Sequence, residues 1–237
     1  HRNLKMHEDL QPGVRRYDYS RDEGDFHAEN LCIGHGRITF DLASPLGNIE
    51  GIELGVPVSI NVENGIAAMA LAQLAGVGPD DIRAAMKSYA GVDRRSDFRI
   101  KNERHVLLSD YAHHPAELRQ SILSVREVFG GRKLTGIFQP HLYTRTRDFY
   151  KEFAESLSLL DEVILLDIYP ARELPIEGVT SRLIYDLLRP GIEKRLCHKE
   201  ELPGIVGRED FDVLMVLGAG DVDNYMDELA AIIDSKN

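Results

Sequence analysis

Two polar clusters in this sequence carry the residue types that could do chemistry. The first, DYAHHP (residues 110–115), follows the apolar run VLL (residues 106–108), and the second, QPHLYTRTRD (residues 139–148), follows LTGIF (residues 134–138). In an open α/β sheet, the loops that leave the carboxyl ends of neighbouring strands meet at one edge, and ligands bind there. The two clusters therefore predict one site, and their histidines and arginines favour an anion as its ligand.

The residues of the first cluster also have purely structural alternatives. Asp110 at the end of a strand can form a turn or cap a helix, or it can bind the two hydroxyls of a ribose. His113 and His114 can be surface-loop residues, or they can join His141 in a metal site, although adjacent histidines rarely converge on one ion. This spacing argues against a metal site. The remaining interpretation is anion recognition beside the amino terminus of a helix.

The second cluster can likewise be an ordinary helix start, with Arg145, Arg147 and Asp148 forming solvated ion pairs. Against this, Thr144 and Arg145 directly follow a strand, which puts a hydroxyl and a guanidinium within one turn of His141. The planar fork of arginine suits carboxylate or phosphate oxygens, because it can donate two parallel hydrogen bonds to them.

Two weaker signals lie outside these clusters. The GAGD stretch (residues 218–221) is at most half of a dinucleotide-binding fingerprint, and its small residues can serve only a tight turn from strand to helix. Asn61 and Asn64 precede an Ala-rich helix, where asparagine is a routine cap, or their amides can read the edge of an adenine.

The elements that must position the clusters alternate between strand and helix after residue 97. The expected strands are 97–101, 105–109, 134–138, 162–167, 194–198 and 211–217. The expected helices are 115–129, 146–160, 181–188, 200–206 and 221–235. This alternation predicts an α/β fold with a mostly parallel, Rossmann-like sheet.

The residues before this region have a different pattern. Strand-like stretches are expected at 14–20, 26–35, 37–42 and 48–54. An Ala-rich helix is expected at 64–76, with Ile66, Met69, Ala70 and Leu74 on its buried face. A second helix is expected to begin with Asp80 or Asp81 as its N-cap and to bury Ile82, Ala85, Met86 and Tyr89. We place a domain boundary at GVDRRS (residues 91–96), which gives one domain at 1–96 and another at 97–237.

Composition narrows the classes of function. The 28 Lys and Arg residues against 39 Asp and Glu residues give a net charge of −11. Such a chain repels nucleic acid, so any phosphate it binds must be held by a local basic cluster. Only two cysteines occur, far apart at Cys32 and Cys197, and no run approaches the roughly 18 apolar residues of a membrane span. We therefore expect a cytoplasmic protein that does not bind membranes.

Taken together, five stretches make the chain similar to the Mur ligase family. They are GVDRRSDF, DYAHHPAE, FQPHLYTRTRD, YPARELPIEGVTSRLI and LGAGD, and QPHLYTRTRD resembles the L-alanine-adding branch. In this resemblance, residues 1–96 correspond to the end of the central ATPase domain and residues 97–237 to the carboxyl-terminal domain. It implies an ATP-dependent ligase of peptidoglycan precursor synthesis that joins L-alanine to UDP-N-acetylmuramate through an acyl phosphate.

The resemblance also implies roles for individual residues. It assigns ATP binding to Asn61, Asn64, Arg95 and Asp110. It assigns catalysis to His141 and Arg145, which would act on the reacting phosphate and the carboxylate of L-alanine. It assigns substrate binding to Tyr111, His113, His114, Tyr143, Thr144 and Arg147. The base that takes the proton from the amine is not identified.

The chain departs from the family pattern in several places. The glycine-rich GxxGKT loop that wraps the phosphates of ATP does not occur in it, and the ligands of Mg²⁺ are expected in an upstream segment. Ile60 stands where the HNxxN pattern has histidine, and Leu142 stands where many relatives have arginine. We therefore expect a fragment that is inactive alone and works with upstream amino-terminal and central domains. A second copy of the chain is a candidate partner through exposed strand edges.

Two alternatives stay open at this point. One is a noncatalytic module that binds a nucleotide or an amino acid with the same loops. The other is the sister ligase that recycles a murein tripeptide, against which QPHLYTRTRD argues.

Overall fold

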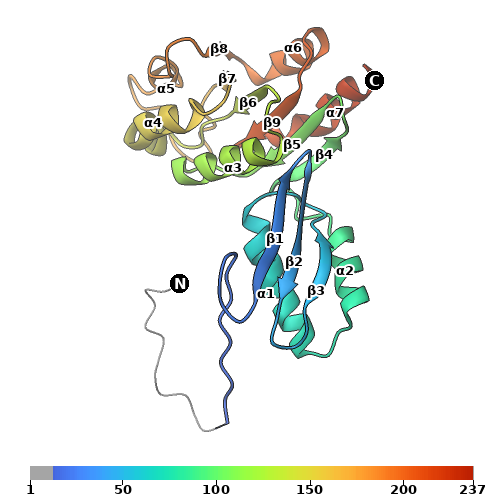
Figure 1. The fold of residues 1–237 in the computed structure, drawn as a ribbon. Coiled ribbons are helices and arrows are strands. Elements are labelled where there is room, and N and C mark those ends of the chain that lie inside the picture. The colour runs from blue at the N-terminus through green and yellow to red at the C-terminus, as the bar shows by residue number, and fades with distance from the viewer. Residues whose placement is uncertain (1–12, 237) are drawn as a thin grey trace. The chain divides into compact units, whose positions relative to one another are not determined.

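The computed structural model describes residues 13–236, which divide into two compact units after Tyr89. Figure 1 shows the helices and strands of both units. Among these residues, no helix combines the length and the apolar character needed to cross a bilayer.

The first unit contains a three-stranded antiparallel sheet and two helices. The strands β1 (His27–Gly34), β2 (Arg37–Ala43) and β3 (Ile49–Glu53) pair in chain order. They are followed by α1 (Ile60–Leu74) and α2 (Pro79–Ser88). Alternate residues of β2 are buried, at Ile38, Phe40 and Leu42, because successive side chains of a strand point to opposite faces.

Several predictions for this unit are wrong. Residues 14–20 form no strand and make only an isolated bridge between Tyr19 and Phe26. Leu74 is largely exposed, whereas the other three predicted core residues of α1 are buried. Of the residues predicted to be buried by α2, Ala85 is exposed, Met86 is half-buried, and Tyr89 is exposed and follows the helix. The N-cap is Gly78, so Asp80 and Asp81 lie in the first turn instead.

Asn61 and Asn64 do not precede the Ala-rich helix, as the sequence suggested, but lie inside it. The helix α1 begins at Ile60, and its N-cap is Ser59. The Nδ2 of Asn61 donates to the carbonyl oxygen of Val56 at 3.2 Å, which ties the first turn of α1 to the chain that enters it.

The second unit is built around a six-stranded sheet in the order β4-β5-β9-β6-β7-β8. Its strands are β4 (Asp97–Lys101), β5 (Val106–Asp110), β6 (Leu134–Phe138), β7 (Glu162–Leu166), β8 (Glu193–Cys197) and β9 (Val213–Leu217). All neighbouring strands are parallel except β4, which pairs antiparallel with β5. The predicted α/β fold with a mostly parallel sheet is confirmed.

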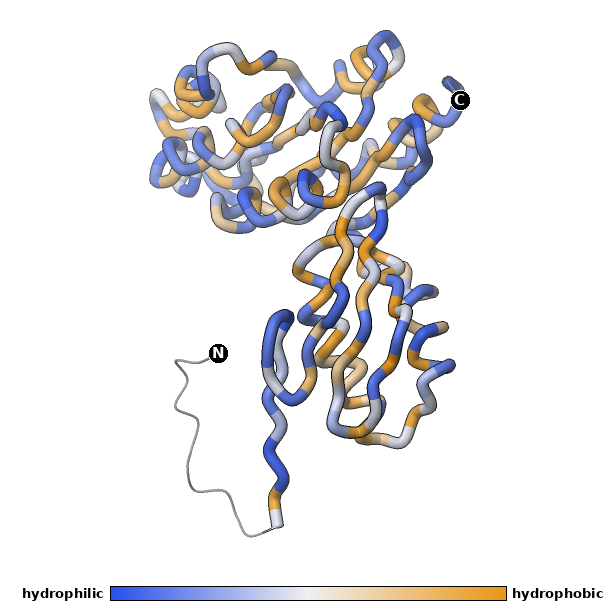
Figure 2. The backbone as a smooth tube through the Cα atoms, viewed as in Figure 1, coloured by the Kyte–Doolittle hydropathy of each residue, from blue (hydrophilic) through white to orange (hydrophobic). Residues whose placement is uncertain are grey.

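Helices cover both faces of this sheet. They are α3 (Pro115–Val128), α4 (Tyr143–Leu157), α5 (Arg182–Tyr185), α6 (Leu202–Arg208) and α7 (Met226–Asp234), with short 3₁₀ turns η1 (Lys199–Glu201) and η2 (Val222–Tyr225). Figure 2 shows hydrophobic and hydrophilic residues alternating along the helices, as expected for helices that bury one side.

Two adjacent residues of β6 show which helices pack against each face of the sheet. Ile137 belongs to a buried cluster that includes Leu202 of α6 and Leu229 of α7. Phe138, on the opposite face, packs against Phe153 of α4 with ring centroids 5.4 Å apart. Because the strand alternates its side chains, α6 and α7 cover one face and α4 covers the other.

The helix α3 follows its predicted pattern. Pro115 is its first residue, and Leu118, Ile122, Val125 and Phe129 are buried. In contrast, α4 begins at Tyr143, three residues before the predicted start at Thr146. The predicted helix at 181–188 shortens to the single turn of α5.

Candidate functional site

The predicted site lies where β5, β6 and β9 end. The two strands that carry the clusters, β5 and β6, are not neighbours as the sequence suggested, because β9 lies between them and pairs with both. The clusters meet nevertheless: the rings of His113 and His141 have centroids 6.2 Å apart.

Asp110 is the most densely bonded residue of the first cluster. Its Oδ2 accepts hydrogen bonds from the backbone nitrogen and the hydroxyl of Ser96, both at 3.1 Å, and from the hydroxyl of Ser121 at 3.2 Å. Its Oδ1 accepts from the backbone nitrogen of Ala112 at 3.0 Å. The carboxylate thus fixes the chain that enters β4, and this geometry favours the structural alternative for Asp110.

Arg94 lies inward at this edge, whereas the predicted ATP-binding residue Arg95 is exposed. The guanidinium of Arg94 lies over the ring of Tyr111, 4.6 Å from its centroid, and donates to the carbonyl oxygen of Gly220 at 3.1 Å. Its Nε lies 3.3 Å from the carboxylate of Asp223. Arg94 is not among the predicted site residues, because the RR dipeptide gives no sign of which arginine lies inward.

Contacts between aromatic and basic side chains join the two clusters. Tyr111 packs edge-on against His113, with centroids 5.2 Å apart. His141 stacks on Tyr169 at 5.7 Å, and its Nδ1 lies 3.4 Å from the guanidinium of Arg145. Burial, the charge of Arg145 and the nearby His113 together hold the pKa of His141 below its usual value. The structure therefore brings Tyr111, His113, His141 and Arg145 into one group.

The loop after β7 holds the second cluster in place, which the sequence analysis did not foresee. Backbone hydrogen bonds join Tyr169 to Pro140 at 2.8 Å and Leu142 to Tyr169 at 2.9 Å. The carboxylate of Glu173 accepts from the backbone nitrogen of Thr144 at 3.0 Å and from its hydroxyl at 2.5 Å. These hydrogen bonds hold the pKa of Glu173 below its usual value. YPAREL was visible in the sequence as a motif, but its contact with residues 140–144 is long-range.

Carboxylates hold the backbone at the start of α3 and of α4. Glu117 accepts from the backbone nitrogens of His113 at 3.0 Å and His114 at 3.2 Å, and Glu173 caps α4. Burial raises the pKa of Glu117, but hydrogen bonding and the nearby histidines lower it more. These carboxylates therefore fix the chain just before α3 and the second residue of α4.

The other predicted site residues have structural contacts. His114 is exposed, caps α3 and packs edge-on against Phe149 at 5.2 Å. Arg147 is exposed and pairs with Asp148 at 2.8 Å, which matches the ordinary ion pair considered for it. Tyr143 is half-buried in the first turn of α4. Asn61 and Asn64 belong to the first unit, where the Nδ2 of Asn64 donates to Asn61 at 3.3 Å.

The GAGD loop packs closely against Gln139. A Cβ at Gly218 or Gly220 would collide with Gln139, so glycine is required for this close approach. The side chain of Gln139 accepts from the backbone nitrogen of Val222 at 3.0 Å and donates to Asp221 at 2.8 Å. The tight-turn interpretation of these glycines is therefore the one that the structure favours.

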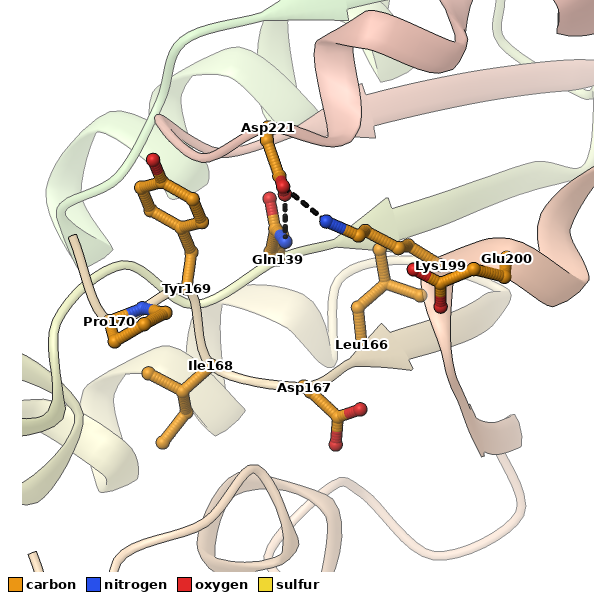
Figure 3. A pocket seen from close by; sticks show the side chains of 9 residues that line it. All are labelled: Gln139, Leu166, Asp167, Ile168, Tyr169, Pro170, Lys199, Glu200 and Asp221. Carbon is orange, nitrogen blue, oxygen red and sulfur yellow. Dashed lines mark hydrogen bonds and ion pairs between the residues drawn. The ribbon is translucent and has the colours of Figure 1, made fainter. Parts of the chain in front are cut away.

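Next to this contact is a pocket of about 240 Å³. Figure 3 shows the side chains of Gln139 and Lys199 both directed at the carboxylate of Asp221. Tyr169 also lines the pocket. The attraction of Lys199 and the hydrogen bond from Gln139 outweigh burial and lower the pKa of Asp221. Among residues 13–236, no group of three or more His, Cys, Asp or Glu side chains is placed to hold a metal ion.

A sheet whose helices cover both faces, with basic and aromatic side chains gathered at its carboxyl edge, defines the class of ligand-binding α/β domains. The family model described as "Mur ligase, glutamate ligase domain" matches residues 94–220, more than half of the chain. The chain therefore belongs to the Mur ligase family.

Curated relatives support this assignment. The chain is 62% identical to a UDP-N-acetylmuramate--L-alanine ligase of Phocaeicola vulgatus, over 99% of this chain and 51% of that protein. It is 56% identical to the protein of the same name from Parabacteroides distasonis, over 94% of this chain and 48% of that protein. The chain thus spans about half the length of the curated relatives it matches.

Solved structures support the fold. The UDP-N-acetylmuramate-alanine ligase of Thermotoga maritima matches with a TM-score of 0.73 and 24% identity, over 91% of this chain and 47% of that chain. A folylpolyglutamate synthase of the same organism matches with a TM-score of 0.66 and 16% identity, over 86% of this chain and 47% of that chain.

Proposed function

We propose that the chain forms part of an ATP-dependent ligase that joins the amino group of L-alanine to the carboxylate of UDP-N-acetylmuramate. The observation that carries the proposal is the 62% identity to a relative with this name across nearly the whole chain. The grouping of His113, His141 and Arg145 at the carboxyl edge of the sheet supports it.

In this proposal, residues 1–96 belong to a central ATPase domain and residues 97–237 form the carboxyl-terminal domain. ATP would phosphorylate the sugar carboxylate, and the acyl phosphate would then be attacked by the amine. Such chemistry depends on positioned charge over developing negative oxygens more than on a covalent nucleophile. We assign that role to the guanidinium of Arg145, whose orientation is set by its contact with His141.

ATP is the expected cofactor, and a related ligase of Thermotoga maritima has been solved in complex with ADP. Asn61, Asn64, Arg95 and Asp110 stay the proposed contacts of ATP, with Asp110 acting largely through the chain it anchors. Mg²⁺ is expected to accompany ATP, but the described residues offer no group of three or more His, Cys, Asp or Glu side chains that fits the ion.

The remaining proposed substrate contacts are Tyr111, His113, His114, Tyr143, Thr144 and Arg147. Tyr111 and His113 have the best support, because their rings touch each other and lie beside His141. The proposed working location is the cytoplasm, where the nucleotide substrates are found.

The test uses the protein encoded by the complete gene and measures phosphate release with Mg-ATP, UDP-N-acetylmuramate and L-alanine. We expect turnover, and we expect Arg145→Ala to lower kcat/KM by about 100-fold or more, as for other lost charge-stabilising donors. Arg119→Ala is the matched control, because Arg119 is an exposed arginine of α3. The 237-residue chain alone is expected to release no phosphate.

Other outcomes would contradict the proposal. Turnover with a murein tripeptide in place of L-alanine would identify the sister ligase. Binding of nucleotide without turnover by the complete protein would favour a noncatalytic module. Equal activity of Arg145→Ala and Arg119→Ala would remove Arg145 from the mechanism.

A further inference from the structure

The hydrogen bonds of the two site histidines fix them in opposite tautomers. The Nδ1 of His113 lies 2.9 Å from the carbonyl oxygen of Tyr111. A carbonyl oxygen can only accept, so Nδ1 of His113 carries the proton and donates it. The lone pair of the neutral ring is therefore on Nε2.

His141 has the reverse arrangement. Its Nδ1 lies 3.4 Å from a guanidinium nitrogen of Arg145, and a guanidinium can only donate. Nδ1 of His141 therefore presents its lone pair to Arg145, and the proton of the neutral ring is on Nε2. Burial and the charge of Arg145 both lower the pKa of His141, which keeps this ring neutral.

The charged groups beside the two rings also differ: a carboxylate lies beside His113 and a guanidinium beside His141. A carboxylate oxygen of Glu117 lies 3.4 Å from Nδ1 of His113, where it stabilises a positive charge on that ring. Two backbone nitrogens hold this carboxylate, so its position is fixed. The other charged group beside this ring pair is Glu173, which acts on His141 more weakly than Arg145 does. His113 thus has a fixed carboxylate beside its Nδ1, whereas His141 is set up to remain a neutral donor.

From this pairing we propose that His113 is the general base of the reaction and removes a proton from the ammonium group of the attacking amine through its Nε2. The inference rests on the proposed function. Among residues 13–236, no hydrogen-bond partner occupies Nε2 of His113, and its side chain is 26% exposed, so a substrate can reach it. The 6.2 Å between ring centroids lets one small amino acid contact both histidines.

The proton and electron balance of the step is complete. The N–H bond of the ammonium breaks, its electron pair becomes the nucleophile, and the proton passes to Nε2, giving an imidazolium beside Glu117. The amine then forms a C–N bond with the acyl phosphate, and the C–O bond to phosphate breaks with its electrons on the leaving oxygen. The second amine proton leaves with the phosphate, and the imidazolium returns its proton to water.

The first test is made on the 237-residue chain and needs no activity. Nitrogen-15 NMR of histidine-labelled chain distinguishes the two tautomers of each ring. We expect protonated Nδ1 for His113 and protonated Nε2 for His141, with assignments from His113→Asn and His141→Asn. A His113 ring with its proton on Nε2 would overturn the proposal.

The second test uses the protein from the complete gene and two acceptors. Hydroxylamine is uncharged near neutral pH, so its attack on the acyl phosphate needs no base, whereas the ammonium of L-alanine must lose a proton. We expect His113→Asn to lower kcat/KM for L-alanine by about 100-fold to 10,000-fold. Product formation with hydroxylamine is expected to stay within about twofold.

The matched control is His198→Asn, because His198 is an exposed histidine of the same unit that bonds to Asp167. This variant is expected to leave the rates with both L-alanine and hydroxylamine unchanged. Equal losses with L-alanine and hydroxylamine in His113→Asn would show a structural role and overturn the proposal, as would an unchanged rate with L-alanine. If the unmodified protein uses neither acceptor, the proposed function fails, while the tautomer measurement still reports on the histidines.

Discussion

The loop that leaves β5 and the loop that leaves β6 each follow a buried strand and begin a helix, but they are stabilised differently. The loop after β5 is held mainly by its own neighbourhood: Glu117 and His114 cap α3, and Asp110 binds Ala112. The loop after β6 is held from a distance, by Tyr169 and by Glu173. Local rules of capping therefore predict the first helix start but not the second.

The second loop also stores backbone strain, which the first does not. Leu142 has φ of 74° and ψ of 135° at the N-cap of α4, a conformation that residues other than glycine rarely adopt. It persists because its carbonyl oxygen accepts from Thr146 and its nitrogen donates to Tyr169. The strain lies between His141 and Arg145, so it helps to set the angle between these two side chains.

The largest effect on stability is expected from a substitution in the loop after β5. Asp110→Ala removes an acceptor of four hydrogen bonds and leaves partly buried donors of Ser96 and Ser121 without their partner. We expect the free energy of unfolding to fall by about 3 kcal/mol. Urea unfolding of the chain measures it, with Asp148→Ala as an exposed aspartate control. A loss no greater than that of the control would show that the carboxylate is dispensable.

Leu142 offers a direct measurement of the strain in the second loop. Alanine normally stabilises a chain relative to glycine, but at this φ we expect Leu142→Gly to exceed Leu142→Ala in stability by about 1 kcal/mol. Both variants lose the leucine side chain beyond Cβ, so their difference reports mainly on the backbone conformation. A more stable alanine variant would mean that the loop relaxes when the side chain is removed.

The cap that Glu173 provides for α4 can be removed by a single substitution. Glu173→Ala removes the acceptor for the backbone nitrogen and hydroxyl of Thr144. We expect the amide of Thr144 to exchange with solvent several-fold faster, measured by NMR, while the amide of Ala116 in α3 is unchanged. Glu177→Ala, an exposed glutamate of the same segment, is the control. Unchanged exchange at Thr144 would show that α4 starts without this cap.

The smallest effect concerns the titration of His141. Its folded-state pKa lies below the ordinary value of 6.5, first because of burial and then because of Arg145. The unfolded chain therefore binds this proton more readily, and the contribution of His141 to stability is lost as pH falls from about 6.5 through the folded pKa. Arg145→Gln should move the NMR midpoint upward, whereas Arg119→Gln should leave it in place; a downward movement would contradict the assigned cause.

Much of the second unit could be predicted because its central strands are short, mostly apolar runs. VLL, LTGIF and VLMVL each become a buried strand, and the helix after the first begins at Pro115 as expected. The order of the strands could not be read locally. Nothing in residues 213–217 indicates that β9 pairs with both β5 and β6.

The candidate site was predictable in its members more than in their roles. The sequence named His113, His141 and Arg145, which the structure brings together. It could not show that Arg94 lies inward while Arg95 is exposed, because that depends on backbone angles, with φ of 60° at Arg94. Nor could it show that Glu173 caps a helix 29 residues earlier in the chain.

The position of β9 has a consequence for the way the chain is made. It is the last strand of the described chain, yet it fills the centre of the sheet, between β5 and β6. A protein is synthesised from its amino terminus, so β5 and β6 leave the ribosome first, each with an unpaired edge. Until residues 213–217 emerge, this unit has no continuous sheet. Folding of this sheet therefore waits for residues 213–217, and a chain that stops before residue 213 retains two unpaired edges, at β5 and at β6.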